Sequence, residues 1–257
     1  MTYAIQGIAY FFTHPRLWLM AICPLLLTLV FAVASVVVIF AIALHPQARG
    51  LADAGVPDGL AWVLAILLVV IEIFLATLIY SLIVLPCYTD KVFEQVMIDK
   101  GHGELVHNEK NHASCGRTCS ACCRVSVCLR FMLLILTLPL NLIPIIGTII
   151  YIWINGLLFG WEAHLYYFEL KGYRYSEQKE VVDAHKHTYS SFGMQALFFE
   201  MIPGFGSFFL FTNAVGAALF AADLEAELRQ SHAYWNSVND DKDNNNGNPR
   251  ATAYHVI

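Results

Sequence analysis

Long apolar stretches alternate with short polar segments along this chain. Two apolar runs, from about Leu17 to Leu44 and from about Gly59 to Leu85, are separated by a polar link. The first carries no charged residue, and the second carries one, Glu72, near its centre. A helix needs about 20 mostly apolar residues to cross the hydrocarbon core. The pattern therefore predicts two long transmembrane helices.

The pattern Ile-Pro-x-x-Gly followed by a hydroxyl residue occurs twice, at residues 143–148 and 202–207. Proline is tolerated in the first turn of a helix and disfavoured inside one, so we expect a turn and a new helix at each copy. The apolar arm from Phe192 to Ile202 is too short to cross a bilayer. The predicted fold is thus an all-α polytopic membrane protein with two long transmembrane helices and two half-penetrating (re-entrant) helical hairpins. Proline kinks in ordinary membrane helices are the alternative.

The polar segments divide the chain. We expect a membrane domain at residues 1–228, with a cytosolic cysteine-rich loop at 99–128, and a disordered polar tail at 229–257. Residues 1–16 are amphipathic, which suits a helix in the membrane interface or one packed on the rest of the protein. With this topology every Lys and Arg except Arg49 lies on one side, so both termini are predicted to be cytosolic. Pro86 is expected to end the second span.

Composition narrows the function classes. The chain is 58% apolar and only 14% charged, with a net charge of −5, so it has the balance of a membrane protein and no basic stripe for nucleic acid. No cleavable signal peptide is expected. The sequence contains no credible nucleophile–base constellation, so we expect neither an enzyme nor a cofactor.

The two helix starts suggest an anion or polar-substrate path. Free N–H groups at helix N-termini bind anions, and glycine lets a ligand approach the backbone. Making the turns and letting helices pack closely is the alternative role. We also expect two asparagines to hydrogen-bond between helices, and Glu162, His164 and Glu200 to reach the membrane interface. The candidate path residues are Gly147, Thr148, Gly206, Ser207, Asn155 and Asn213.

Glu72 is an intramembrane acid. A carboxyl group at mid-membrane is costly and usually faces the protein interior. It is expected to hydrogen-bond a polar group of another helix or to serve a proton-coupled path, and structural hydrogen bonding is the favoured alternative. Its negative charge would oppose anion passage.

Five cysteines cluster before the third apolar region, at Cys115, Cys119, Cys122, Cys123 and Cys128. Cysteines beside a membrane and flanked by arginines are typical of S-palmitoylation. Zinc binding with nearby histidines, or free reduced thiols, are the alternatives, so the metal content of this cluster stays open.

Four sequence blocks together resemble the CysZ-type sulfate permeases and their eukaryotic relatives, the etoposide-induced endoplasmic-reticulum proteins. In chain order, the blocks are His14-Pro15-Arg16-Leu17 with Ile22-Cys23-Pro24-Leu25-Leu26; Leu85-Pro86-x-Tyr88-x-Asp90-Lys91; Leu142-Ile143-Pro144-Ile145-Ile146-Gly147 with Trp161-Glu162-Ala163; and Phe192-Gly193 with Ile202-Pro203 and Asn213-Ala214-Val215-Gly216-Ala217. The resemblance implies the same arrangement of two long membrane helices and two partly inserted helix pairs.

The resemblance also implies a function, with one departure. Bacterial members bind sulfate through a Gly-Leu-Arg motif after the first proline, but here the matching stretch is Arg16-Leu17-Trp18-Leu19 and the motif is missing. Arg16 is the nearest basic residue. The resemblance therefore implies either a permease or channel for a small anion such as sulfate, or a eukaryotic endomembrane protein with a structural, trafficking or autophagy-related role. The expected partners are the lipid bilayer, an anion and a second copy of the chain. The expected location is the endoplasmic reticulum, with a bacterial inner membrane as the alternative.

Overall fold

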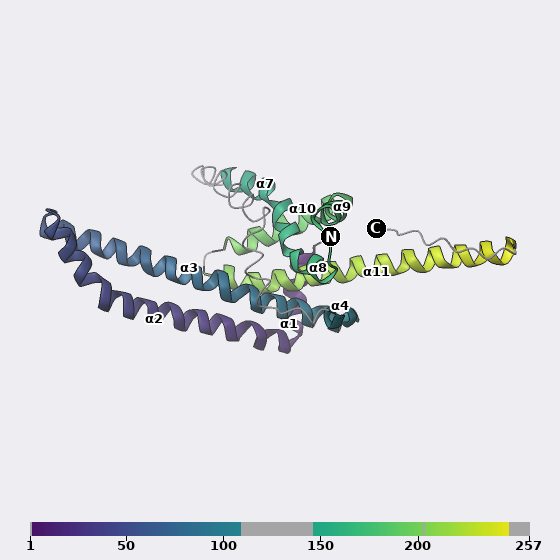
Figure 1. The fold of residues 1–257 in the computed structure, drawn as a ribbon, viewed down its shortest axis with the longest axis horizontal. Coiled ribbons are helices and arrows are strands. Elements are labelled where there is room, and N and C mark those ends of the chain that lie inside the picture. Colours follow the sequence, from purple (N-terminus) through teal and green to yellow (C-terminus); the bar gives the residue numbers. More distant parts are fainter. Residues whose placement is uncertain (1, 109–145, 203, 247–257) are drawn as a thin grey trace. The chain divides into compact units, whose positions relative to one another are not determined.

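The computed structural model describes residues 2–108, 146–202 and 204–246, where all regular elements are α-helices (Figure 1). The all-α prediction is therefore confirmed for this part of the chain. Two compact units are distinguished: residues 15–91, and residues 1–14 together with 92–257.

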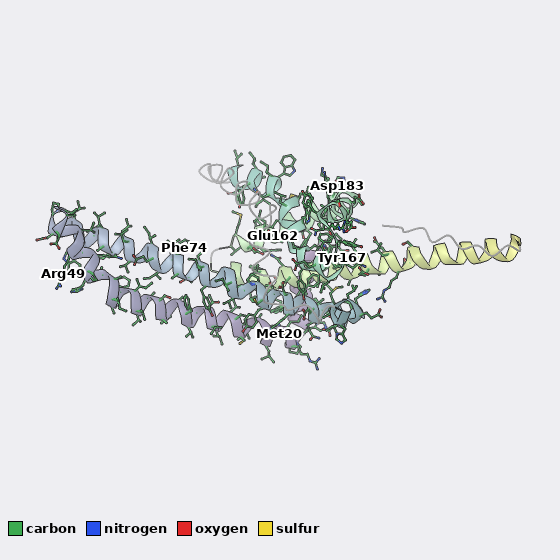
Figure 2. All side chains as sticks on the ribbon, viewed as in Figure 1. Met20, Arg49, Phe74, Glu162, Tyr167 and Asp183 are labelled. Carbon is green, nitrogen blue, oxygen red and sulfur yellow. The ribbon has the colours of Figure 1, made fainter. Side chains whose placement is uncertain are left out.

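The unit of residues 15–91 is a hairpin of two long helices. Helix α2 (Pro15–Asp53) and helix α3 (Asp58–Asp99) are joined by a turn in which Gly55 has a φ of 94°, a value that favours glycine. The rings of Phe31 and Tyr80 stack at 4.0 Å between centroids and hold the two helices together. Both helices expose apolar side chains along their length, and Phe74, labelled in Figure 2, is 63% exposed. Exposed apolar surface on such long helices suits contact with lipid.

The prediction that Pro86 ends the second span is wrong, because α3 continues through it to Asp99. Proline has no backbone N–H, so the carbonyl four residues earlier, that of Leu82, loses its helical donor, a loss that membrane helices tolerate. Two side chains near the proline bond other carbonyls of the helix: the Cys87 thiol lies 3.5 Å from the Ile83 carbonyl oxygen, and the Thr89 hydroxyl donates to the Pro86 carbonyl at 2.9 Å.

The second unit is built from shorter helices around α11. Its helices are α1 (Tyr3–Thr13), the end of α3, α4 (Gly103–Asn108), α7 (Ile146–Ala163), α8 (Leu165–Leu170), α9 (Tyr175–Ala184), α10 (Lys186–Glu200) and α11 (Gly206–Asn246). Its buried core is dominated by aromatic side chains, among them Tyr167, Phe168, Tyr189, Phe192, Phe211 and Phe220.

Glycines allow α7 and α10 to pack with their backbones in contact. A Cβ added at Gly193 of α10 would collide with the Gly156 carbonyl oxygen and the Gly160 nitrogen of α7. A Cβ at Gly160 would in turn collide with the Tyr189 carbonyl. Because Gly156 faces Met194 while Gly160 faces Tyr189, the two helices are antiparallel. The N-terminal end of α7 therefore lies beside the C-terminal end of α10.

Helix α1 packs on α11 in the same way. A Cβ at Gly216 would lie 2.6 Å from the Tyr3 carbonyl oxygen, and the Tyr3 and Phe220 rings stack at 4.8 Å. Phe11 contributes an edge-to-face contact with Phe208. Of the two alternatives for the amphipathic N-terminal segment, packing on the rest of the protein is confirmed.

Among the residues that the structure describes, four stretches are long and apolar enough to cross a membrane: residues 15–53, 58–99, 146–170 and 206–231. The first two correspond to the two predicted long spans. The last two include the predicted returning arms of the hairpins, whereas α10 is not among them. Helix α11 continues without a break to Asn246, across the predicted start of the polar tail.

Candidate functional site

Four of the predicted path residues lie at the starts of α7 and α11. Gly147 and Thr148 are in the first turn of α7, and Gly206 and Ser207 open α11. The turn before α11 contains Gly204 with a φ of 81°. A Cβ at Gly206 would lie 2.5 Å from the Glu200 carbonyl oxygen. Glycine at this position therefore lets the chain turn tightly, which supports the structural alternative, while anion binding stays a prediction.

Asn213 ties α11 to the last turn of α10. Its side-chain amide donates to the Ala196 carbonyl at 3.1 Å and to the Glu200 carboxyl oxygen at 2.9 Å, and Asn213 is buried. This confirms the expected interhelical hydrogen bond for Asn213. The Asn155 amide, also buried, donates to the Tyr151 carbonyl of its own helix at 2.9 Å.

The remaining predicted sites are distributed differently. Arg16 is the exposed second residue of α2, so it belongs to the unit of residues 15–91, while the six other path residues belong to the second unit. Residues 115–128, with the five clustered cysteines, lie outside the described residues. Within the described ranges, no group of three or more His, Cys, Asp or Glu is placed to hold a metal ion.

Glu72 has a hydrogen-bond partner on the neighbouring helix. The Gln47 side-chain amide on α2 donates to the Glu72 carboxyl oxygen on α3 at 2.5 Å. The structural role favoured from the sequence is thereby supported, because the polar group is satisfied within the hairpin. A proton-coupled path through Glu72 stays a prediction.

Sequence reasoning missed a buried polar contact centred on His164. This residue is fully buried at the break between α7 and α8, so the expectation that it reaches the membrane interface is wrong. Its Nε2 lies 2.9 Å from the Ala217 carbonyl oxygen of α11, and its Nδ1 lies 2.8 Å from the Tyr189 hydroxyl of α10. A carbonyl only accepts, so Nε2 donates to Ala217 and the Tyr189 hydroxyl donates to Nδ1. One imidazole thus joins three segments of the unit.

A second polar cluster lies about two helix turns further along α11. The buried Glu225 carboxylate accepts a hydrogen bond from the Tyr167 hydroxyl at 2.6 Å and pairs with the Lys171 ammonium at 2.9 Å. Each buried charge therefore has a partner, as burial requires. Figure 2 shows Tyr167 among the helices of this unit.

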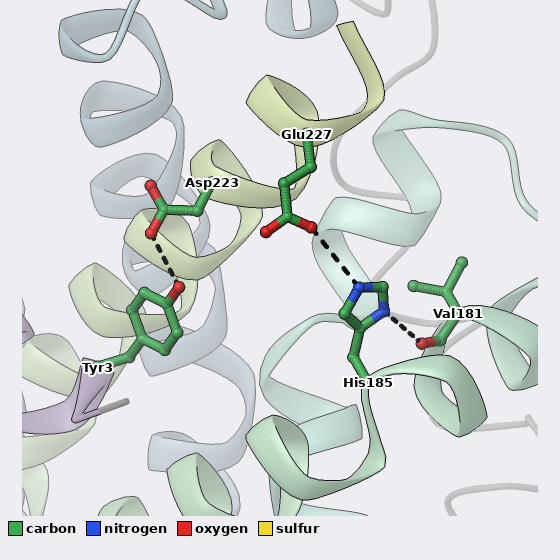
Figure 3. A network of polar contacts seen from close by, with 5 residues as sticks. All are labelled: Tyr3, Val181, His185, Asp223 and Glu227. Atoms are coloured by element: carbon green, nitrogen blue, oxygen red, sulfur yellow. Dashed lines mark hydrogen bonds and ion pairs between the residues drawn. The ribbon is translucent and has the colours of Figure 1, made fainter. Parts of the chain in front are cut away.

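Asp223 and Glu227, the acidic neighbours of Glu225 on α11, make further polar contacts with other helices of this unit (Figure 3). The Tyr3 hydroxyl of α1 donates to the Asp223 carboxylate at 2.8 Å, and burial together with this carboxylate raises the pKa of Tyr3 above its ordinary value. His185 donates from Nδ1 to the Val181 carbonyl, and its Nε2 lies 3.7 Å from the Glu227 carboxylate.

These contacts hold helices together and satisfy one another. The only sequence signal for them was the row of acids at alternate positions, Asp223, Glu225 and Glu227, after the apolar part of α11. Their partners lie 58 and 220 residues away for Glu225 and Asp223, so no local pattern reveals them.

The fold and these contacts define a polytopic α-helical membrane protein with a short-helix unit bound together by aromatic and polar contacts. The family model described as "Sulfate transporter CysZ/Etoposide-induced protein 2.4" matches residues 3–210, and the chain belongs to this family. The resemblance found in the sequence is therefore confirmed. Neither a curated protein nor a solved structure matches the chain.

Proposed function

We propose that this chain is a non-enzymatic membrane protein that acts on the bilayer itself by inserting helical hairpins partway into it. The observation that carries this proposal is the polarity of the unit built from α7, α10 and α11. One end of these helices is apolar and exposed, and the other end holds the charged contacts.

The apolar end combines the start of α7 with the turn between α10 and α11. Trp153 of α7 is 68% exposed and Phe205 of the turn is 61% exposed, and Ile146, Ile149, Phe198 and Met201 are exposed as well. Because α7 and α10 are antiparallel, these side chains gather at one end. A surface of this kind suits the hydrocarbon region rather than water.

The polar end lies at the opposite end of the same helices. It contains the Lys171–Glu225 pair, the His185–Glu227 contact and the polar helix α9 (Tyr175–Ala184). This end suits the headgroup region and the cytosol. A unit that is apolar at one end and charged at the other is expected to enter a membrane from one side.

Helix length supports partial insertion of the α10–α11 hairpin. Helix α10 has 15 residues, and a helix of that length extends about 22 Å, less than the roughly 30 Å of a hydrocarbon core. Because α10 follows the polar α9 directly, its far end is expected to stop inside the bilayer. A half-inserted hairpin adds area to one leaflet only, which favours curvature.

The seam between α7 and α10 supports this role over conduction. Three glycines of this seam, none of which is a predicted path residue, have neighbouring backbone atoms within contact distance of the place where a side chain would start: Gly156, Gly160 and Gly193. They allow close helix packing, as small residues do at membrane helix interfaces.

Deformation of giant unilamellar vesicles by the purified full-length protein tests the proposal. Tubules are expected with the native chain, and the Phe205→Ser variant is expected to form markedly fewer at equal protein density. The Phe74→Ser variant is the matched control, because it removes the same side chain from the exposed surface of α3. Vesicles that remain spherical with folded native protein, or variants that deform them equally, would contradict the proposal.

Transport of a small anion is the second candidate. The description of the matching family and the exposed guanidinium of Arg16 favour it. Its test is sulfate flux into liposomes that contain the native chain, Arg16→Ala or Gly206→Leu. Saturable flux that both variants lose would establish a transporter, and flux equal to that of empty liposomes would reject it.

On the first proposal the chain resides in a eukaryotic endomembrane such as the endoplasmic reticulum, with both termini cytosolic, and associates with a second copy. Co-localisation of a fluorescent fusion with an endoplasmic-reticulum marker tests the location. Crosslinking in lipid tests self-association, which a purely monomeric band would reject.

A further inference from the structure

The Glu72 carboxyl lies at the depth where a bilayer tolerates charge least. Glu72 is in the middle of the apolar run of α3, and the side chains that follow it, Phe74 and Leu75, are exposed (Figure 2). Exposed apolar side chains on this span suit contact with acyl chains. The surroundings of Glu72 therefore offer a charge little stabilisation beyond what the protein itself supplies.

No cation of the hairpin neutralises this carboxyl. The sequence has no Lys or Arg between Arg49 and Lys91. The titratable side chains next to Gln47 along α2 are His45 and Arg49, which are exposed. Within the described ranges neither of them forms an ion pair with Glu72. An unpaired carboxylate in hydrocarbon is costly, and a bound proton removes that cost.

The amide that faces Glu72 lacks a hydrogen-bond donor. The Gln47 Oε1 atom is buried and, among the described residues, receives no hydrogen bond, although buried amide oxygens usually do. The Gln47 Nε2 and Glu72 Oε1 atoms are only 2.5 Å apart. N–H···O bonds span about 2.7–3.2 Å, whereas O–H···O bonds span about 2.5–3.0 Å. Both features indicate that a proton between the two side chains is missing.

A proton on Glu72 accounts for both features. An amide and a neutral carboxylic acid each offer the other one donor and one acceptor, so they can form two hydrogen bonds at once. If the amide nitrogen and oxygen exchange places, the 2.5 Å contact becomes an O–H···O bond from Glu72 to Gln47. A carboxylate has no donor, and it would leave the Gln47 oxygen without a partner in either orientation.

We propose that Glu72 is a proton-binding site inside the membrane and that the Gln47 amide holds the protonated form. The carboxyl takes its proton from water, and the neutral acid then both donates to Gln47 and accepts from it. The inference does not depend on the proposed function. A neutral Glu72 lets α3 lie in hydrocarbon without a charge, and it also removes the negative charge that would oppose anion passage.

Infrared spectroscopy of the purified full-length protein in lipid bilayers at neutral pH tests the site. The glutamates are isotope-labelled at the side-chain carboxyl, so that their bands can be told from those of aspartate. The native chain is expected to show the C=O band of a protonated glutamate, and Glu72→Gln is expected to lose this band. Because glutamine also donates and accepts, this variant keeps a hydrogen-bonded pair with Gln47 and is expected to fold.

Two further variants separate the site from other carboxyl groups and test the role of the amide. Glu180→Gln removes an exposed glutamate of α9 and is expected to keep the band. Gln47→Leu is expected to keep the band but to move it to higher frequency, because the carboxyl C=O loses its donor. A band at the native frequency in Gln47→Leu would overturn the role given to the amide.

Three other results would overturn the proton site itself. A native chain without a protonated-glutamate band would show that Glu72 is a carboxylate. An undiminished band in Glu72→Gln would assign the proton to a different glutamate. Loss of the native band when sodium replaces a bulky organic cation, at equal ionic strength and pH, would identify a site for a metal cation instead.

Discussion

At the residue scale, the buried polar groups determine how firmly the helices hold together. His164 connects the α7–α8 break to Tyr189 and to the Ala217 carbonyl. A buried group that loses its partner costs about 1–3 kcal/mol, whereas removing both partners together costs less.

We therefore expect His164→Phe and Tyr189→Phe each to lower the free energy of unfolding by about 1–3 kcal/mol. The double variant is expected to lose less than the sum, with a coupling of about 1 kcal/mol, since no polar group of the pair remains unpaired. Steric trapping in bicelles measures the free energy of unfolding of the two single variants and of the double variant. Tyr175→Phe, at an exposed tyrosine, is the control. Strictly additive losses would mean that the two rings do not act as a pair.

His102, between α3 and α4, makes stability depend on pH. Burial, and then the nearby Arg229 guanidinium, lowers the pKa of His102 below its ordinary value, against the opposing carboxylates of Glu225 and Glu104. In the unfolded chain this imidazole binds a proton at about pH 6.5. The unfolded state therefore takes up a proton first as the pH falls, and the stabilisation present above that pH is lost on acidification.

We expect the free energy of unfolding of the native chain to fall between about pH 7 and pH 5, and His102→Gln to flatten this decline. Glutamine can still donate to the Ala222 backbone, to which the imidazole hydrogen-bonds, but it does not titrate. His187→Gln, which removes an exposed imidazole of α10, is the control. An unchanged slope in His102→Gln would show that acid sensitivity arises elsewhere.

At the scale of elements, glycine positions determine which helices can touch. Gly193→Ala is expected to lower the free energy of unfolding by about 1–3 kcal/mol, because the new Cβ must push α10 away from the backbone of α7. Gly50→Ala in α2 is the matched control: a Cβ there meets nothing within 4 Å, so a neutral or slightly stabilising effect is expected. Equal melting temperatures for the two variants would show that the contact between α7 and α10 has room for the added methyl group.

The elements also show what a sequence can and cannot reveal. The two long apolar runs predicted α2 and α3. The two Ile-Pro-x-x-Gly repeats predicted the starts of α7 and α11, each of which lies within three residues of the proline. The passage of α3 through Pro86 was missed, because a proline ends a helix in water more often than it does in a membrane helix, where it is tolerated. The contacts of His164 and Glu225 were missed because their partners are distant in sequence. Candidate path residues were located on the correct helix starts, but their packing could not be foreseen.

At the scale of the whole molecule, the depth of the α10–α11 turn separates the two topologies. If α10 and α11 crossed the bilayer fully, Phe205 would emerge into water on the far side. If the hairpin is half-inserted, as the 15 residues of α10 favour, Phe205 stays in hydrocarbon.

Cysteine accessibility in sealed vesicles measures this depth. In a background with the seven native cysteines replaced by serine, a membrane-impermeant thiol reagent is expected to label Ala54→Cys from one side and Lys179→Cys from the other. Phe205→Cys is expected to react from neither side while the vesicles are intact and to react once detergent dissolves them. Labelling of Phe205→Cys from the Ala54 side would instead require a full crossing. The proposal of half-inserted hairpins needs the α10–α11 turn to lie in hydrocarbon. That single result would therefore exclude it while leaving the family assignment intact.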